Sequence, residues 1–471
     1  MMQSNILEEF NIRNITPNYA EYFLSVYATS DNKDINIFNY ILNITQPSGY
    51  YILHVYCGVK NIDKCFIESI IKKGYNVNEK NYDGNYPLHI ASKINNNHVI
   101  EILLKNGADP NACDKENRTP IYYLSGNDDE VINKIKLLVD NGALLNSSVD
   151  NNGCGPLLAC IDPSERVFNK MMSIGFESKI MDKFGRNNIQ RHIIYSDNPS
   201  ASTISMMIDN GINPAKPDND GNTPLHSICY KNANKYSKII DILLQFNDVN
   251  KYNKYGDTPL TVLVKTLSTK YIFKKLIEKC NVIDDQLINV CIEYDRCDLL
   301  DIITLTGKKP IKSDKFISGI KTGSFRCIKY LFKNGIYDKN ALYYAVISEY
   351  EILVDYLLFN RFSVDVLIDG NTCISECVRL NNNVLLSKLM LHNPTPKTMY
   401  YTLRAIKKHK LDKYLIMPYM AYFVIMRPEF CKIKKYYMYY KKFVIDLVHA
   451  NVSYDVFGSD TDNDNDIDND S

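Results

Sequence analysis

Tryptophan and long apolar runs are absent from this sequence of 471 residues. A helix needs roughly 18 consecutive apolar residues to cross a bilayer, and the longest apolar candidate, residues 415–426, is shorter and contains Pro418. The opening Met-Met-Gln-Ser-Asn supplies neither the charged nor the apolar part of a secretion signal. We therefore expect a soluble protein of the cell interior, with no membrane partner.

The sequence also has no C-x-x-C pair among its 13 cysteines. The closest pairs are Cys373/Cys377, Cys154/Cys160 and Cys291/Cys297, and none has two histidines at zinc-ligand spacing. An odd number of scattered cysteines favours reduced thiols, many of which serve as small buried apolar residues. We expect neither a metal site nor a disulfide framework.

Catalytic signatures are missing as well. The chain contains no G-x-x-x-x-G-K-[ST], G-x-G-x-x-G, H-E-x-x-H or G-x-S-x-G sequence. An enzyme needs a nucleophile, a base or a metal that converge in one cleft, and no such cluster stands out. The sequence predicts a protein without enzymatic activity and without a cofactor.

What the chain does contain is a repeat that is set in register by proline. Pro87, Pro120, Pro156, Pro224 and Pro259, with Asn188 in the proline position of one unit, are separated by 33, 36, 32, 36 and 35 residues. This period is that of ankyrin repeats, each of which is a hairpin finger followed by two helices. Such a stack buries each unit against its neighbours and therefore needs no central core.

Particular residues of each unit have identifiable roles in starting and ending its helices and turns. Thr223 can cap the first turn of a helix, and Pro224 at the next position has a preset φ and lacks an amide that would be unpaired there. Gly107 and Gly142 follow apolar stretches, where glycine tolerates the left-handed conformation that ends a helix. The Asp-x-x-Gly segment between units is turn chemistry. We predict an all-α fold, an ankyrin-repeat solenoid whose C-terminal units have lost their fingers.

Three histidines recur at one position of the repeat. His54, His89 and His226 stand where an imidazole usually hydrogen-bonds the backbone of the neighbouring unit, which favours a structural role over a catalytic one.

The repeat motif fades along the chain and suggests five regions. Two helical patterns, at 20–27 and 35–42, precede the repeats, and the finger motif thins beyond about residue 282. We predict an N-terminal helical cap at 1–46, fingered ankyrin repeats at 47–282, degenerate ankyrin-like helix pairs at 283–403, a basic helical region at 404–457 and a disordered acidic tail at 458–471.

The last two regions have opposite charge. Residues 404–442 carry a net charge of +9, and residues 443–471 carry −8. Lysines that alternate with tyrosines could contact nucleic acid, but an amphipathic helix with its aromatic side chains facing inward explains the pattern better. The tail resembles a calcium loop only superficially, because it lacks the glycine and the glutamate that such a loop requires.

The exposed finger tips are the candidate binding surface. Stacked units are expected to present a concave face, made of the finger tips and the first helices, to protein partners. Tyr82, Phe184 and Tyr255 occupy tip positions, with Lys183 and Lys254 beside them. Exposed aromatic side chains are typical interface anchors, although they could instead pack on the adjacent finger. We predict protein binding at these five residues.

The chain resembles the poxvirus ankyrin-repeat proteins, and in particular orthopoxvirus members of intermediate length. The resemblance rests on residues 83–93, the Asn-Gly-Ala-Asp-Pro-Asn at 106–111, the Leu-Leu-Phe-Asn at 357–360 and the Ala-Tyr-Phe-Val at 421–424. It implies a host-range or immune-evasion factor that captures host proteins in the host cytoplasm, with the nucleus as the alternative compartment.

Many members of that family carry a C-terminal F-box-like region, often called PRANC, that docks on Skp1 and cullin-1. The nearest counterpart here includes Leu415, Pro418 and Met420, but Met417 stands where those proteins have leucine. Two hypotheses follow from the resemblance. The protein sequesters a host signalling or cell-death component, or it is a substrate adaptor that delivers a host target to a Skp1–cullin-1 ubiquitin ligase.

Overall fold

The computed structural model describes residues 17–29, 33–45, 51–123, 128–147, 149–231, 233–266 and 270–411, and beyond these only positions 415, 416, 419, 438, 441 and 442. Most of the predicted basic C-terminal region and all of the predicted acidic tail lie outside the described residues. The chain divides into two compact units, Met1–Asn281 and Val282–Ser471.

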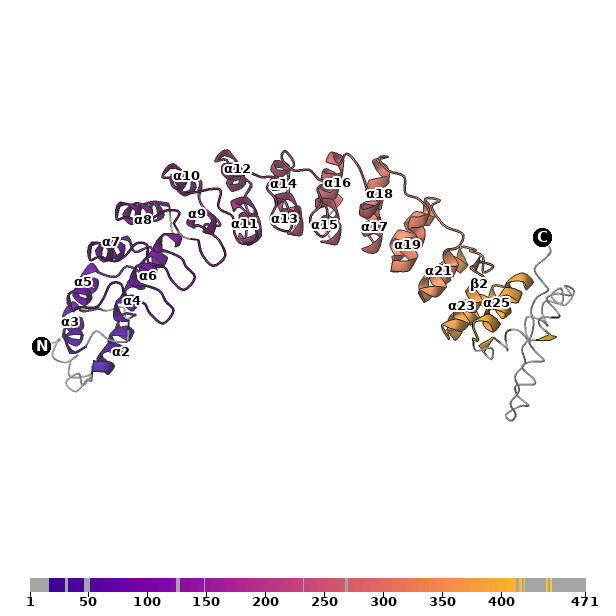
Figure 1. The fold of residues 1–471 in the computed structure, drawn as a ribbon, viewed down its shortest axis with the longest axis horizontal. Coiled ribbons are helices and arrows are strands. Elements are labelled where there is room, and N and C mark those ends of the chain that lie inside the picture. Colours follow the sequence, from indigo (N-terminus) through magenta and orange to yellow (C-terminus); the bar gives the residue numbers. More distant parts are fainter. Residues whose placement is uncertain are drawn as a thin grey trace. The chain divides into compact units, whose positions relative to one another are not determined.

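Unit 1 is built from helices in two rows (Figure 1). Its helices are α2 (Pro17–Tyr27), α3 (Ile35–Ile44), α4 (Ile52–Cys57), α5 (Lys64–Lys72), α6 (Pro87–Ile94), α7 (Asn97–Lys105), η2 (Pro120–Tyr122), α8 (Asp128–Asp140), α9 (Pro156–Ala159), α10 (Glu165–Ser173), α11 (Asn188–Tyr195), α12 (Ala201–Asp209), α13 (Pro224–Tyr230), η3 (Ala233–Tyr236), α14 (Ser237–Leu243), α15 (Pro259–Lys265) and α16 (Lys270–Lys279).

The first helices of successive repeats pack side by side, from α4 through α6, η2, α9, α11 and α13 to α15. We call these the first-helix row. The second helices form a parallel row that includes α5, α7, α8 and α10. The loops that join one repeat to the next extend beside the first-helix row (Figure 1). Each of these loops, such as residues 73–86, ends directly before a first helix.

Local sequence signals place the helix ends. Helices α6, α13 and α15 begin at Pro87, Pro224 and Pro259, as the repeat register predicts. Gly107 and Gly142 adopt φ values of +83° and +87° just beyond the ends of α7 and α8, which confirms their predicted role in ending those helices. Helices α2 and α3 cover the two patterns expected before the repeats.

Unit 2 continues the helix pairs with shorter links. Its elements are α17 (Asp285–Glu293), α18 (Cys297–Leu305), α19 (Asp314–Thr322), α20 (Phe325–Lys333), α21 (Ala341–Ile347), α22 (Glu351–Phe359), β1 (Leu367–Ile368), β2 (Asn371–Thr372), α23 (Cys373–Arg379), α24 (Asn383–Leu391) and α25 (Pro396–Lys408). Residues 306–313 and 334–340 are the links between successive pairs, and they leave no room for a finger.

One finger returns before α23. There β1 and β2 pair antiparallel, with Leu367 opposite Thr372. Asp369 and Gly370 join them at φ values of +51° and +80°, as a tight two-residue hairpin turn requires. Cys373 then opens α23 in the position that proline holds elsewhere.

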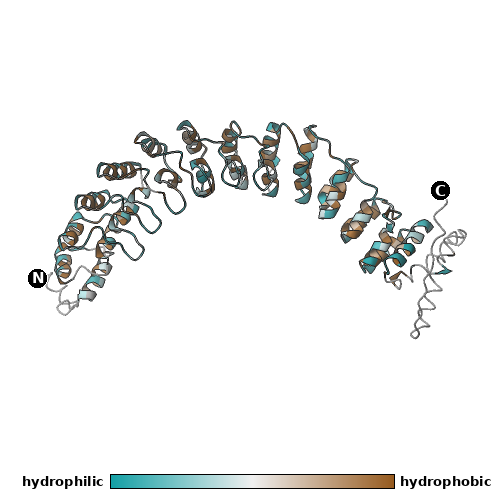
Figure 2. Cartoon of the chain, in the orientation of Figure 1, coloured by the Kyte–Doolittle hydropathy of each residue, from teal (hydrophilic) through white to brown (hydrophobic). Residues whose placement is uncertain are grey.

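Hydrophobic residues recur along the helices of each unit (Figure 2), and many of their side chains are buried. The largest fully buried ones in the first unit include Tyr56, Phe168 and Phe273, and Phe316 is the corresponding residue of the second unit. The predicted helical solenoid is confirmed, with a sheet limited to two short strands among the described residues.

Candidate protein-binding surface

Each finger of unit 1 is held by one side chain at its start. In the finger at 182–186, the Asp182 carboxylate accepts hydrogen bonds from the amides of Phe184 (3.0 Å) and Arg186 (2.9 Å). The Gly185 amide donates to the Asp182 carbonyl at 2.8 Å, and its φ of +76° suits glycine. Asp114, Asp150, Asp218 and Asn253 hold their fingers in the same way.

Backbone hydrogen bonds then tie the tips of neighbouring fingers together. These bonds run from Asn151 N to Glu116 O (3.0 Å), from Lys183 N to Asn152 O (2.6 Å), from Asn219 N to Phe184 O (2.8 Å) and from Lys254 N to Asp220 O (2.8 Å). Between the first two fingers, the Lys115 ammonium donates to the Tyr82 carbonyl. The tips therefore lie side by side as an ordered surface, which suits a binding site better than independent loops would.

The histidines predicted to bridge repeats do so. Nε2 of His89 lies 2.9 Å from the Arg118 carbonyl, and Nε2 of His226 lies 3.2 Å from the Asp257 carbonyl. Nε2 of His54 reaches the carbonyls of Glu79 (3.0 Å) and Asn85 (3.1 Å). Burial lowers the pKa of all three imidazoles below 6.5, because the charged form loses solvation. Their structural role is confirmed.

Two residues of another type also bond the backbone of the next repeat, and neither was predicted. The Tyr122 hydroxyl donates to the Cys154 carbonyl at 2.8 Å, and the Gln190 amide donates to the Asn222 carbonyl at 2.8 Å. Each stands two residues after the first residue of its helix, as His89 does after Pro87. Counting from the helix start would have found them.

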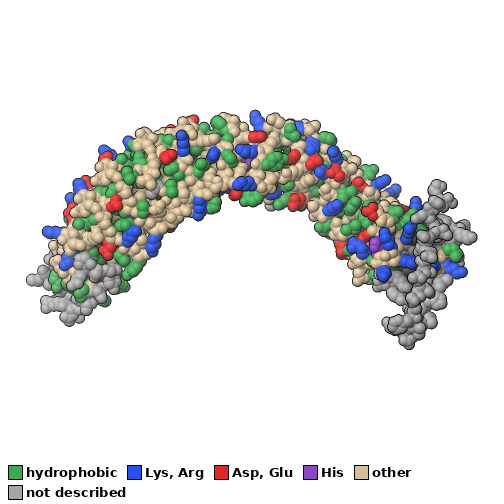
Figure 3. Space-filling view, viewed as in Figure 1, with side chains coloured by type: hydrophobic (Ala, Val, Ile, Leu, Met, Phe, Trp, Pro, Cys, Tyr) green, Lys and Arg blue, Asp and Glu red, His purple; other side chains and the backbone are tan. Residues whose placement is uncertain are grey.

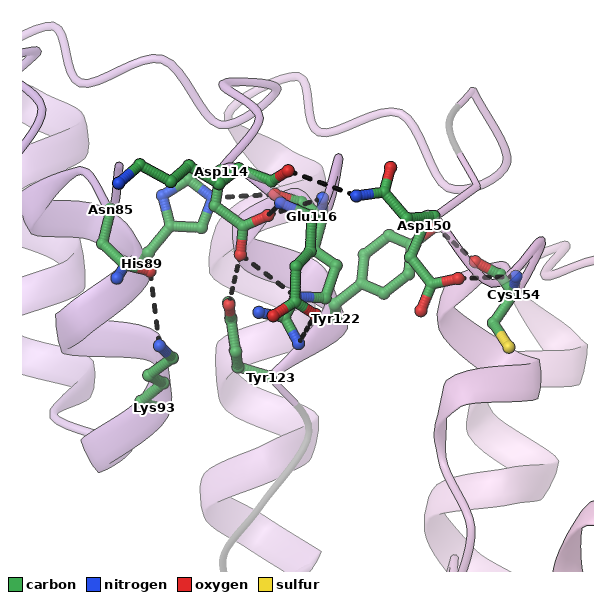
Figure 4. A network of polar contacts seen from close by, with 12 residues as sticks. Asn85, His89, Lys93, Asp114, Glu116, Tyr122, Tyr123, Asp150 and Cys154 are labelled. Carbon is green, nitrogen blue, oxygen red and sulfur yellow. Dashed lines mark hydrogen bonds and ion pairs between the residues drawn. The ribbon is translucent and has the colours of Figure 1, made fainter. Parts of the chain in front are cut away.

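Polar contacts also join several fingers to the helix that follows. The Tyr123 hydroxyl donates to Asp114 at 2.6 Å, and the Lys93 ammonium donates to the Asn85 side chain at 3.3 Å (Figure 4). Lys93 also lies 4.7 Å from the centre of the Tyr123 ring. These contacts fix the surface between the fingers and the first-helix row.

The predicted tip residues lie on three different fingers. Tyr82 is 78% exposed, and the edge of its ring meets Tyr51 at 4.9 Å between centroids. Tyr255 is 69% exposed, and the exposed Lys254 precedes it on the same tip. Both rings thus keep most of their surface in solvent, although packing on an adjacent finger was the alternative.

Phe184 has a different environment. It is 47% exposed, and two cations of its own finger lie against its ring, Lys183 at 5.3 Å and Arg186 at 4.1 Å from the centroid. The first-helix row adds exposed aromatic side chains outside the tip positions, Tyr195 at the end of α11 and Tyr230 at the end of α13. On the face in Figure 3, Lys and Arg side chains are visible along the edge that carries the fingers.

The described part of the chain also bears on the expectations for disulfides, metal sites, membrane spans and ligase docking. The twelve cysteines described there are free, and no group of three or more His, Cys, Asp or Glu side chains there could hold a metal ion. No described helix has both the length and the apolarity to span a membrane. Of the residues predicted for ligase docking, Leu415 is one of the isolated described positions, whereas Pro418 and Met420 lie outside the described residues. That docking stays a prediction.

Comparisons with known proteins agree with this architecture. The ankyrin repeat family matches residues 83–115 and 220–254. The monkeypox virus protein "Inhibitor of Apoptosis OPG037" is 60% identical over 439 residues, which cover 93% of this chain and 99% of that protein. The vaccinia virus (strain Copenhagen) protein of the same name is 57% identical over 468 residues, with 97% and 98% coverage. The solved ankyrin repeat domain of Bcl-3 aligns at 17% identity with a TM-score of 0.36, over 53% of this chain and 99% of that domain.

Proposed function

This chain belongs to the orthopoxvirus ankyrin-repeat proteins of the OPG037 family, and we propose that it blocks host cell death as a non-enzymatic scaffold. It does so by holding a host protein of the death pathway on its fingers in the host cytoplasm. The name of the relatives supports the pathway, and the repeat architecture supports binding over catalysis.

The observation that carries the proposal is the exposure of Tyr82 and Tyr255 on tips that are otherwise ordered by hydrogen bonds. The finger does not need an aromatic tip, because Asn151 and Asn219 occupy tips of the same construction. An exposed aromatic ring leaves apolar surface in water, at a cost of about 25 cal/mol for each Å². A protein partner that covers these rings would recover that cost, and aromatic residues dominate the energetics of interfaces.

The test is recovery of host proteins from cells that produce the tagged full-length chain. We expect the combined change of Tyr82, Phe184 and Tyr255 to alanine to reduce recovery of the host partner and to restore caspase activity after a death stimulus. The thermal unfolding midpoint should stay within a few degrees of the wild type, since exposed side chains contribute little to stability.

A matched control changes exposed aromatic residues away from the fingers. Tyr40 (46% exposed) and Tyr271 (65% exposed) lie on α3 and α16, outside the fingers and the first-helix row. Their change to alanine should leave recovery and caspase inhibition intact. Equal loss in both variants, or full recovery with the fingertip variant, would reject the finger surface as the binding site.

A further inference from the structure

The Arg186 guanidinium lies near two aromatic rings and makes no hydrogen bond to the described residues. It lies 4.1 Å from the centre of the Phe184 ring and 5.4 Å from that of Tyr195. Its Nε is 3.2 Å from the Asp182 carboxylate, in a geometry that makes an ion pair without a hydrogen bond. Within the described residues, its side chain therefore has oriented but unused donors. A planar guanidinium held in this way is suited to a carboxylate.

The finger at 114–118 shows what such a donor set binds. Arg118 stands at the same finger position as Arg186, four residues after the aspartate. It donates to Asp114 at 3.0 Å, and Nη1 contacts the Glu116 carboxylate at 2.8 Å. The residue that corresponds to Glu116 in the later finger is Phe184. That finger therefore has the arginine but not the second carboxylate that neutralises its counterpart.

The charge around Arg186 favours an anion. Asp182 is fully buried and is shared with Arg191, whose Nη1 donates to it at 3.1 Å. Lys183 is exposed on the same tip, and Lys254 is exposed two fingers further on. Asp220, on the finger between them, is the exposed acidic side chain of these three tips. Two arginines thus share one buried carboxylate, and the exposed Lys183 adds a further positive charge on the same finger.

We infer that Arg186 and Lys183 form a carboxylate-binding subsite, and that the partner presents an acidic protein segment to it, with an apolar side chain beside the acid. The carboxylate takes the place that Glu116 holds on Arg118, and the apolar side chain packs on the exposed part of Phe184 and Tyr195. This inference rests on the proposed function and names the chemical class of its partner.

The experiment uses the full-length chain and a displayed library of random linear peptides. We expect the enriched peptides to carry Asp or Glu next to an aromatic or aliphatic residue. A synthetic peptide from the enriched set should bind about tenfold to a hundredfold more weakly to Arg186→Gln, as the loss of a charge-assisted hydrogen bond predicts. Its binding should also weaken as salt is raised.

Two further variants sharpen the test. Arg118→Gln removes an arginine from the same position of a finger where the charge is already neutralised, and it should leave peptide binding unchanged. Asp220→Asn removes the exposed acid and should strengthen binding, because it removes a repulsion. Thermal unfolding of each variant establishes that it is folded.

Several outcomes would overturn the inference. These are enrichment of neutral or basic peptides, no enrichment at all, equal binding by Arg186→Gln, or an equal loss with Arg118→Gln. Binding of a duplex DNA oligonucleotide that depends on Arg186 would assign the subsite to phosphate and would also overturn it. The peptide experiment tests only the carboxylate-binding subsite. The proposed function is tested separately, by recovery of the host protein with the fingertip variant, so the two can fail independently.

Discussion

His226 and Gln190 provide an internal test of how neighbouring repeats are joined. His226 is fully buried. Its Nδ1 accepts from the Thr223 amide at 3.2 Å, while Nε2 donates to the Asp257 carbonyl at 3.2 Å. Gln190 makes both bonds with an amide side chain, because its oxygen accepts from the Asn187 amide at 3.4 Å and its nitrogen donates to the next repeat. We therefore expect His226→Gln to preserve the stability of the stack and His226→Ala to reduce it.

The expected cost follows from the bonds that are lost. His226→Ala removes the hydrogen bonds to the Thr223 amide and to the Asp257 carbonyl, worth about 1 kcal/mol each, and leaves the Asp257 carbonyl buried without this donor. We therefore expect a loss of about 3 kcal/mol. His226→Gln should cost less than about 1 kcal/mol, since the bonds are restored. Urea unfolding followed by circular dichroism gives the change. Amide hydrogen exchange at Thr223 reports locally, which matters because a repeat stack need not unfold in one step.

The wild type and His226→Gln should differ in how their folding stability changes at acidic pH. Burial lowers the pKa of His226, so the folded state keeps the imidazole neutral at pH values where the unfolded chain, with a pKa near 6.5, takes up a proton. The stability contributed by His226 is therefore complete above pH 6.5 and is lost as the pH falls below it. His226→Gln should gain stability relative to the wild type between pH 6.5 and 5. Two results would refute this account of how His226 links the repeats. One is a stability difference between the wild type and His226→Gln that does not change with pH, and the other is a His226→Gln variant as unstable as His226→Ala.

Three further predictions concern other parts of the chain. Lys134 is fully buried and donates to the carbonyls of Ser92 (2.9 Å) and Tyr123, so Lys134→Met should lower the free energy of unfolding by about 3 kcal/mol in urea titrations. Burial lowers the pKa of Lys134 to about 7, and wild-type stability should therefore rise from pH 7 towards 10.5 in a way that the methionine variant lacks. Gly185→Ala should lower the melting temperature more than Gly107→Ala, because both have positive φ but only at Gly185 would the added Cβ meet a neighbour, the Asn219 side-chain oxygen at 2.3 Å. If the chain is a ligase adaptor, Skp1 and cullin-1 should be recovered with it and lost on deletion of residues 404–457, and their absence from the wild-type recovery would remove that hypothesis.

The repeat and its helix ends could be predicted from the sequence, because their causes are local. Pro224 opens a helix through its own preset φ, and Gly107 ends one through its own freedom at positive φ. Such signals need only the residues beside them. Repeated at a spacing of 32 to 36 residues, they determined the solenoid, its fingers and the positions of the tip residues.

The partners of side chains from different repeats were decided only by the tertiary structure. Counting from the helix start places Gln190 at the histidine position, but only the structure shows that it donates to the Asn222 carbonyl of the next repeat. The exposed aromatic residues of the finger surface also extend to Tyr195 on the first-helix row. Arg118 and Arg186 hold the same finger position, yet Arg118 pairs with Asp114 and Glu116, whereas Arg186 pairs with Asp182 alone and makes no hydrogen bond to the described residues. The reason is physical: local backbone preferences fix where an element begins and ends, whereas burial, stacking and charge balance depend on which neighbours the stack brings together.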